Sequence, residues 1–300
     1  MSDQVRIVEV GPRDGLQNEK TPVSAETRIA FIENLVKAGL HTIEVGSFVS
    51  PKAIPQMVNS DQVLRAVDHH PGYEFHVLVP NEKGYEAAKA AGAKVIAVFA
   101  SASEGFSRAN INCTVAESIQ RFVPVIERAR ADGIKVRGYV SCVLGCPYDG
   151  EVKPSAVVDV TKKLWDLGCY EVSLGDTIGV GTPSKARQLL RAVAAEVPMR
   201  NLGMHFHDTY GQELANLYAG LEEGARVIDS AAGGLGGCPY APGATGNVAT
   251  EDVVYMLEGM GVATGVDMKQ LVAATNDIAK VLGKSPVSRV ASALNAKARG

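Results

Sequence analysis

Residues 5–15 read Val5-Arg6-Ile7-Val8-Glu9-Val10-Gly11-Pro12-Arg13-Asp14-Gly15, an apolar run that ends in a turn containing glycine and proline. The run has the length and the branched residues of a buried strand. In an open doubly wound sheet that binds a dinucleotide, the turn after the first strand would carry Gly-x-Gly-x-x-Gly, and this turn does not. The segment therefore favours a closed α/β barrel, a (β/α)8 TIM barrel, over the doubly wound sheet.

Further apolar runs follow about every 30 residues, and stretches with helical periodicity lie between most of them. With the first run, they predict eight strands at Val5–Val10, Thr42–Gly46, Glu74–Val79, Lys94–Ala100, Lys135–Ser141, Tyr170–Leu174, Gly203–His207 and Arg226–Ser230. Such regular alternation predicts a parallel sheet closed by right-handed crossovers.

The length of 300 residues suits one such barrel, because barrels of this class commonly need about 250 residues. We therefore expect a single catalytic TIM-barrel domain over residues 1–300. A helix near Glu251–Met260 would complete the barrel, and a helix near Met268–Leu282 would belong to an extra C-terminal helical appendage over about residues 267–300.

Three serines at predicted helix starts are candidate N-caps, namely Ser24, Ser155 and Ser184. A serine oxygen at that position accepts a hydrogen bond from an otherwise unpaired backbone N–H. The last two serines follow Pro154 and Pro183, and proline is itself common in the first turn of a helix.

The overall composition indicates a globular protein that acts on a small molecule. Hydrophobic residues make up 46% of the chain, and the formal net charge is -3 with both signs scattered. This pattern offers no basic stripe for nucleic acid and no cationic amphipathic helix for a membrane. No apolar run approaches the roughly 20 residues that span a bilayer.

The expected compartment is a reducing one. Five irregularly spaced cysteines do not form a disulfide framework, and the first residues lack the pattern of a signal or transit sequence. We expect a cytoplasmic location in a bacterium, or the mitochondrial matrix for a processed eukaryotic chain.

Polar side chains gather where the predicted strands end. Arg13 and Asp14 follow the first strand, Glu44 closes the second, Asp176 follows the sixth, and His205 and His207 close the seventh. In TIM barrels the carboxyl ends of the strands meet at one rim, which carries the active site. We therefore expect these side chains to lie together.

The two histidines are candidate metal ligands. Side chains two apart on a strand share a face, so His205 and His207 should both face the barrel axis. With Asp14 they would supply three ligands for a divalent cation. Alternatively, the histidines are a hydrogen-bonded pair at the rim, Asp14 only shapes its turn, and Asn247 is a helix cap before Thr250-Glu251-Asp252.

The glycine-rich segment 233–246 has too many glycines for a helix and too few branched residues for a strand. We expect a mobile active-site loop that carries Cys238 over the substrate. The alternative is a flexible connection that happens to contain a cysteine. The other four cysteines are expected to be ordinary semi-buried residues.

Two of these segments, 10–19 and 233–240, resemble the 3-hydroxy-3-methylglutaryl-CoA lyase family. The first reads Val10-Gly11-Pro12-Arg13-Asp14-Gly15-Leu16-Gln17-Asn18-Glu19, and the second reads Gly233-Gly234-Leu235-Gly236-Gly237-Cys238-Pro239-Tyr240. Shorter matches lie at residues 47–52, 137–142, 173–179 and 207–212, so the resemblance spans nearly the whole chain.

The resemblance implies a carbon–carbon lyase that cleaves 3-hydroxy-3-methylglutaryl-CoA to acetyl-CoA and acetoacetate, in leucine degradation and ketone-body formation. It also implies a homodimer with an acyl-CoA substrate. The cofactor would be Mg²⁺ or Mn²⁺, held by residues that match Asp14, His205, His207 and Asn247.

The same resemblance assigns the remaining site residues. Arg13 would contact the substrate, and Cys238 would be catalytic. Glu44 and Asp176 match acidic positions near the site, and together with Glu251 they are expected to support it.

These groups suit a retro-Claisen cleavage. A bound cation would lower the pKa of the substrate's tertiary hydroxyl, Arg13 could stabilise charge on the thioester oxygen, and Cys238 could protonate the leaving enolate. The base stays open between Asp14 and His205. Two rival functions are a transferase of the same superfamily that condenses acetyl-CoA with a 2-oxo acid, and a non-catalytic protein that binds metal or acyl-CoA.

Overall fold

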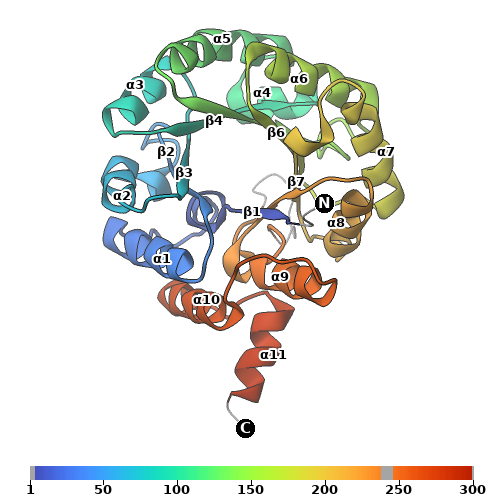
Figure 1. Ribbon diagram of the computed structural model, residues 1–300. Coiled ribbons are helices and arrows are strands. Elements are labelled where there is room, and N and C mark those ends of the chain that lie inside the picture. The colour runs from blue at the N-terminus through green and yellow to red at the C-terminus, as the bar shows by residue number, and fades with distance from the viewer. Residues whose placement is uncertain (1–3, 238–245, 299–300) are drawn as a thin grey trace.

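A computed structural model describes residues 4–237 and 246–298 as a closed barrel of eight parallel strands in sequential order, β1 to β8. Figure 1 looks along the barrel, with helices surrounding the strands. The strands are β1 Arg6–Glu9, β2 Thr42–Ser47, β3 Glu74–Leu78, β4 Val95–Ser101, β5 Lys135–Ser141, β6 Glu171–Asp176, β7 Leu202–Phe206 and β8 Val227–Ser230. The prediction of eight strands and a barrel is confirmed. The closed order excludes the doubly wound sheet.

The helices follow the strands in the expected alternation. They are α1 Ala25–Lys37, α2 Ser60–Val67, α3 Glu82–Ala90, α4 Glu104–Ile111, α5 Val115–Ala131, α6 Pro154–Leu167, α7 Pro183–Ala194, α8 Glu213–Glu222, α9 Thr250–Gly259, α10 Met268–Leu282 and α11 Arg289–Lys297. Short helical turns are η1 Gly11–Gly15, η2 Pro55–Met57, η3 Met199–Asn201 and η4 Ala232–Gly234.

The C-terminal appendage is confirmed, and its described part contains two helices. Helix α10 lies beside α1 and α9 at the outer ring, and α11 projects away from it (Figure 1). The break between them begins at Gly283, which caps α10 with a positive φ of 66°. Glycine reaches this left-handed conformation without the penalty that a Cβ imposes, so it ends the helix there.

One of the three predicted N-caps is correct. Ser24 accepts a hydrogen bond from the Thr27 backbone N–H at 3.2 Å at the start of α1. The other two predictions, Ser155 and Ser184, are wrong, because α6 and α7 begin at the prolines that precede these serines. The N-caps therefore lie two residues earlier, at Lys153 and Thr182. Proline fits the first helical position because its missing N–H would have no intrahelical partner there.

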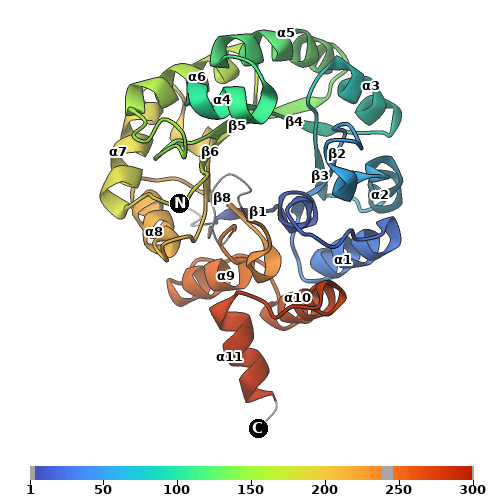
Figure 2. The same ribbon diagram turned by 180° about the vertical axis from the view of Figure 1, so that it is seen from behind.

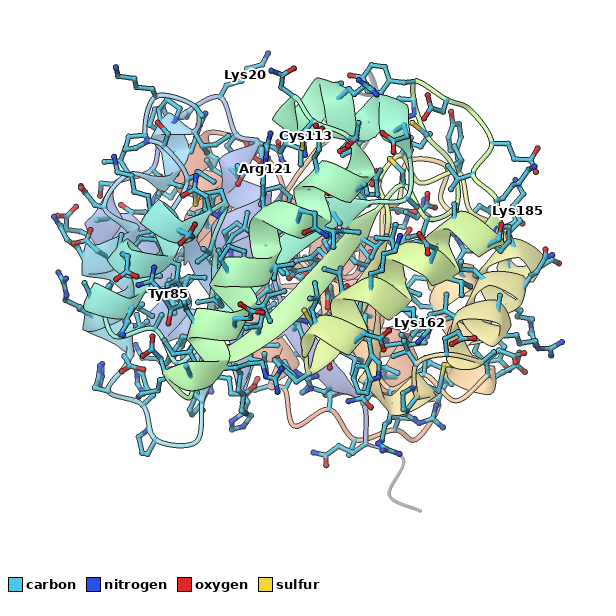
Figure 3. All side chains as sticks on the ribbon, turned by 90° about the horizontal axis from the view of Figure 1, so that it is seen from above. Lys20, Tyr85, Cys113, Arg121, Lys162 and Lys185 are labelled. Carbon is cyan, nitrogen blue, oxygen red and sulfur yellow. The ribbon has the colours of Figure 1, made fainter. Side chains whose placement is uncertain are left out.

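The core fills the layer between strands and helices, as parallel sheets covered on both faces require. Figure 3 views the barrel from the side, with α5 and α6 in front of the strands and Lys162 on the outer surface of α6. Cys113, Cys142, Cys146 and Cys169 are buried free thiols, as expected. Within the described part of the chain, none of the helices is both long and apolar enough to cross a membrane.

Candidate active site

Three of the predicted metal ligands meet at the carboxyl end of the barrel. Ligand atoms of Asp14, His205 and His207 all lie within 4.8 Å of one another. Asp14 comes from η1 after β1, His205 from β7, and His207 from the residue just beyond β7. Figure 2 shows the barrel from behind, with α4, which follows β4, near β5 at one edge of the barrel.

Asn247 joins the group through the backbone and its side chain. It forms an isolated β-bridge with His207, and its Nδ2 donates to Asp14 Oδ2 at 2.9 Å and to the Leu235 carbonyl at 3.1 Å. The alternative that Asn247 caps a helix is wrong, since Ala249 is the N-cap of α9. The amide nitrogen faces Asp14, so ligation by the amide oxygen would require the side chain to turn and exchange these hydrogen bonds.

The charges around Asp14 suit a cation. Burial alone would raise the pKa of Asp14, but the Arg13 charge, His205, the Asn247 hydrogen bond and His207 together lower it, so the carboxylate is ionised. Burial and the neighbouring His205 lower the pKa of His207 to about 4, which keeps that imidazole neutral with a lone pair available. One carboxylate and two imidazoles are ligands that first-row divalent cations accept, so the donor set fits.

Behind His205 lies Asp229 of β8, a residue that is not among the predicted site residues. His205 Nδ1 is 3.2 Å from Asp229 Oδ2, and a proton shared there leaves Nε2 as the lone-pair nitrogen. Asp229 also accepts two hydrogen bonds from Arg137, at 2.7 and 3.0 Å, and one from Ser173 at 2.8 Å. Asp229 is an acidic residue within a predicted apolar strand, and that anomaly was the available signal.

Arg13 is held in place by carboxylates on two sides. Its Nε donates to Glu44 Oε2 at 2.7 Å, and its Nη1 donates to Asp14 Oδ1 at 2.8 Å. Burial would lower the pKa of Arg13, but the charges of Glu44 and Asp14 raise it overall, so the guanidinium stays charged. The Tyr139 ring lies 5.8 Å from the guanidinium carbon. Glu44 therefore orients Arg13 at the rim.

Asp176 and Glu251 organise loop backbone. Asp176 accepts hydrogen bonds from the Gly181 N–H at 2.7 Å and the Val180 N–H at 3.2 Å, and burial raises its pKa to about 6. Glu251 accepts from the Gly233 N–H at 3.0 Å and from Thr275, and burial raises its pKa to about 7. These contacts fix the loop after β6 and the start of the glycine-rich segment.

Cys238 lies outside the described residues, and its prediction stays untested. The described ends of the glycine-rich segment lie against each other, because a Cβ on Gly246 would come within 2.6 Å of the Gly236 carbonyl carbon. Gly236 also lies against Asn247, whose Nδ2 would be 2.8 Å from a Cβ there. The beginning of the segment is more regular than expected, since it includes part of the buried turn η4. The segment therefore starts and returns beside the Asp14 group.

Comparison with protein families matches the HMGL-like model over residues 4–278. The chain belongs to the HMGL-like family. The chain is 59% identical over 295 residues, 98% of either length, to the 3-hydroxy-3-isohexenylglutaryl-CoA/hydroxy-methylglutaryl-CoA lyase of Pseudomonas aeruginosa.

Solved structures of this family superpose over nearly the whole chain. The crystal structure of hydroxymethylglutaryl-CoA lyase from Pseudomonas aeruginosa matches with a TM-score of 0.97 and 58% identity, covering 99% of each chain. An HMG-CoA lyase from Acinetobacter baumannii in complex with coenzyme A and 3-methylmalate matches with a TM-score of 0.93 and 36% identity, covering 98% of this chain and 96% of that one. These relatives are lyases, and they do not favour the transferase alternative.

Proposed function

We propose that this chain cleaves 3-hydroxy-3-methylglutaryl-CoA to acetyl-CoA and acetoacetate. The observation that carries the proposal is the meeting of Asp14, His205 and His207 beside Arg13, at one rim of a barrel that matches HMG-CoA lyases throughout. The whole chain, residues 1–300, would act as one catalytic domain. The homodimer stays a prediction from the resemblance, and the cytoplasmic location stays a prediction from the sequence.

The proposed metal ligands are Asp14, His205, His207 and Asn247, with Mg²⁺ or Mn²⁺ as the expected ion. When bound, the cation would supply a Lewis acid that lowers the pKa of the tertiary hydroxyl and orients the substrate. Asp229 would hold His205 in the tautomer that presents Nε2, since its carboxylate faces Nδ1.

Arg13 is proposed to bind the thioester carbonyl, where negative charge develops as the bond between C2 and C3 breaks. Its guanidinium is already oriented by Glu44 and Asp14, so little reorganisation is needed. A preorganised donor of this kind contributes about 3–4 kcal/mol to transition-state stabilisation.

Cys238 is proposed as the acid that protonates the leaving enolate carbon. The described ends of its segment adjoin Asn247, which supports access to the rim. The base that removes the hydroxyl proton is proposed to be Asp14 or His205. A Cys238→Ala protein that binds substrate and metal yet turns over at the full rate would eliminate the cysteine's role.

The decisive experiment is incubation of the protein with 3-hydroxy-3-methylglutaryl-CoA and Mg²⁺, followed by measurement of acetoacetate. We expect product in the presence of the cation. Absence of acetoacetate both with and without a thiol reductant would refute the proposal. Release of free coenzyme A from acetyl-CoA plus a 2-oxo acid would instead support the transferase.

A further inference from the structure

A second group of candidate metal ligands lies away from the catalytic rim. Ligand atoms of Glu33, His69 and His70 all lie within 4.8 Å of one another. Glu33 is in α1, and the two histidines are in the loop between α2 and β3. Helices α1 and α2 are neighbours in both Figure 1 and Figure 2. The loop leads into the amino end of β3, so this group is at the base of the barrel.

We propose that Glu33, His69 and His70 form a surface site for a borderline divalent cation of the Zn²⁺ class. Two imidazoles and one carboxylate are a ligand set that Zn²⁺ accepts, with a water completing a tetrahedron. Imidazole nitrogens suit Zn²⁺, and two of the three ligands here are imidazoles.

The separation of two of the ligands, His70 and Glu33, already approaches that of an occupied site. His70 Nε2 is 3.0 Å from both carboxylate oxygens of Glu33. Bonds of about 2.0–2.1 Å in a tetrahedron place neighbouring ligand atoms about 3.3 Å apart. Only a few tenths of an ångström of side-chain movement separate this pair from that geometry.

Both members of that pair are held by their surroundings. The side chains of His70 and Glu33 are only 22% and 25% exposed. The His70 ring packs against His69, with centroids 4.1 Å apart, and against Tyr73, at 5.7 Å. Restricted rotamers lower the entropic cost of assembling a site.

His69 has the outer-sphere contact that metal-bound histidines commonly make. Its Nδ1 lies 2.8 Å from the Ala66 carbonyl oxygen. A neutral ring that donates from Nδ1 keeps its lone pair on Nε2, the nitrogen a metal would use. An ion pair alone would explain the contact of Glu33 with His70, but a ligand nitrogen of His69 also lies within 4.8 Å of both.

The test counts Zn²⁺ equivalents by equilibrium dialysis of the full chain at neutral pH. Single variants Glu33→Ala, His69→Ala and His70→Ala are compared with the wild type. The catalytic rim is the same in all of these proteins, so any Zn²⁺ bound there adds equally to each count. The matched control is His41→Ala, an exposed neighbouring histidine that stacks on Tyr73 at 4.4 Å and is outside the group. Circular dichroism verifies that each variant is folded.

We expect each of the three variants to lose one equivalent or to bind it at least tenfold more weakly, and the control to match the wild type. Zn²⁺ should also raise the melting temperature of wild type and control more than that of the three variants, since the ion would link α1 to the loop before β3. Equal Zn²⁺ counts and affinities in wild type and His70→Ala would overturn the proposal, as would the same loss in the control.

Discussion

Replacing Asp229 with asparagine tests whether a buried carboxylate behind the rim governs metal binding. The substitution keeps the shape of the side chain, removes its charge, and places an amide against His205 Nδ1. If the amide nitrogen faces the ring, it favours the tautomer with the lone pair on Nδ1, which turns the Nε2 proton toward the metal position. If the amide oxygen faces the ring, the tautomer is kept but the charge that polarises it is lost.

The expected cost follows from the contacts of Asp229. Both Asp229 and Arg137 have fully buried side chains, and Arg137 donates twice to this carboxylate. Removing one partner of a buried ion pair costs about 3–5 kcal/mol. Glu171 still accepts from Arg137 Nε at 2.7 Å, so we expect the lower end, about 3 kcal/mol of unfolding free energy.

Catalysis should weaken as well, because residues that orient metal-bound histidines commonly contribute about 10- to 100-fold to metal affinity or activity. The assay is acetoacetate formation as a function of Mg²⁺ concentration, run where urea unfolding shows the variant to be folded. Ser173→Ala is the control, since it removes one hydrogen bond from a neutral donor to the same charged carboxylate, worth about 1.5–3 kcal/mol, and leaves His205 paired. An Asp229→Asn protein with wild-type kcat/KM and wild-type Mg²⁺ dependence would falsify this reasoning.

Four other outcomes are expected. Arg13→Lys should lower kcat about 100-fold or more while leaving the Mg²⁺ dependence of the activity nearly unchanged, because lysine lacks the forked guanidinium that donates to both Glu44 and Asp14. Steady-state kinetics measure this effect, and an unchanged kcat would contradict it. Chelation by EDTA should abolish acetoacetate formation and added Mg²⁺ should restore it, and full activity after exhaustive chelation would exclude a metal role. Ser24→Ala should cost about 1 kcal/mol in urea unfolding, whereas Ser155→Ala, at an exposed position inside α6, should cost little; equal losses would contradict the assigned caps. Burial raises the pKa of Glu251 to about 7, so its stabilising contribution is complete below about pH 4.5 and is lost, by up to about 3 kcal/mol, as the pH rises through about 7. The Glu251→Gln substitution should therefore reduce the slope of unfolding free energy against pH in this range. An unaltered slope would show that Glu251 is not the titrating group.

Much of the fold was predictable because the strand signal is redundant. Each of eight apolar runs carried its own evidence, and a parallel strand covered on both faces must be apolar along its length. The strand positions are therefore correct, with small errors at the ends. The cap errors at Ser155 and Ser184 arose where two signals competed, because a serine follows a proline and the proline takes the first helical position.

The candidate site was predictable where its residues lie at strand ends, and less so where it depends on packing between strands. Asp14, His205 and His207 were expected together because the carboxyl ends of all strands share one rim. The partners of each group were not predictable in this way. That Glu44 orients Arg13, or that Glu251 binds the Gly233 N–H, depends on side-chain directions that spacing does not determine.

The register between β7 and β8 links the stability of the barrel to its chemistry. His205 lies opposite Asp229 in this pairing, which places the imidazole and the carboxylate side by side. A slip of one residue would bring Ile228 or Ser230 opposite His205 and would turn the carboxylate toward the helices. Arg137 would then lose the fully buried Asp229 as its partner inside the barrel, at a cost of several kcal/mol. The ion pair therefore selects the register that also supports the histidine, and for this reason one substitution at Asp229 should weaken both folding and metal binding.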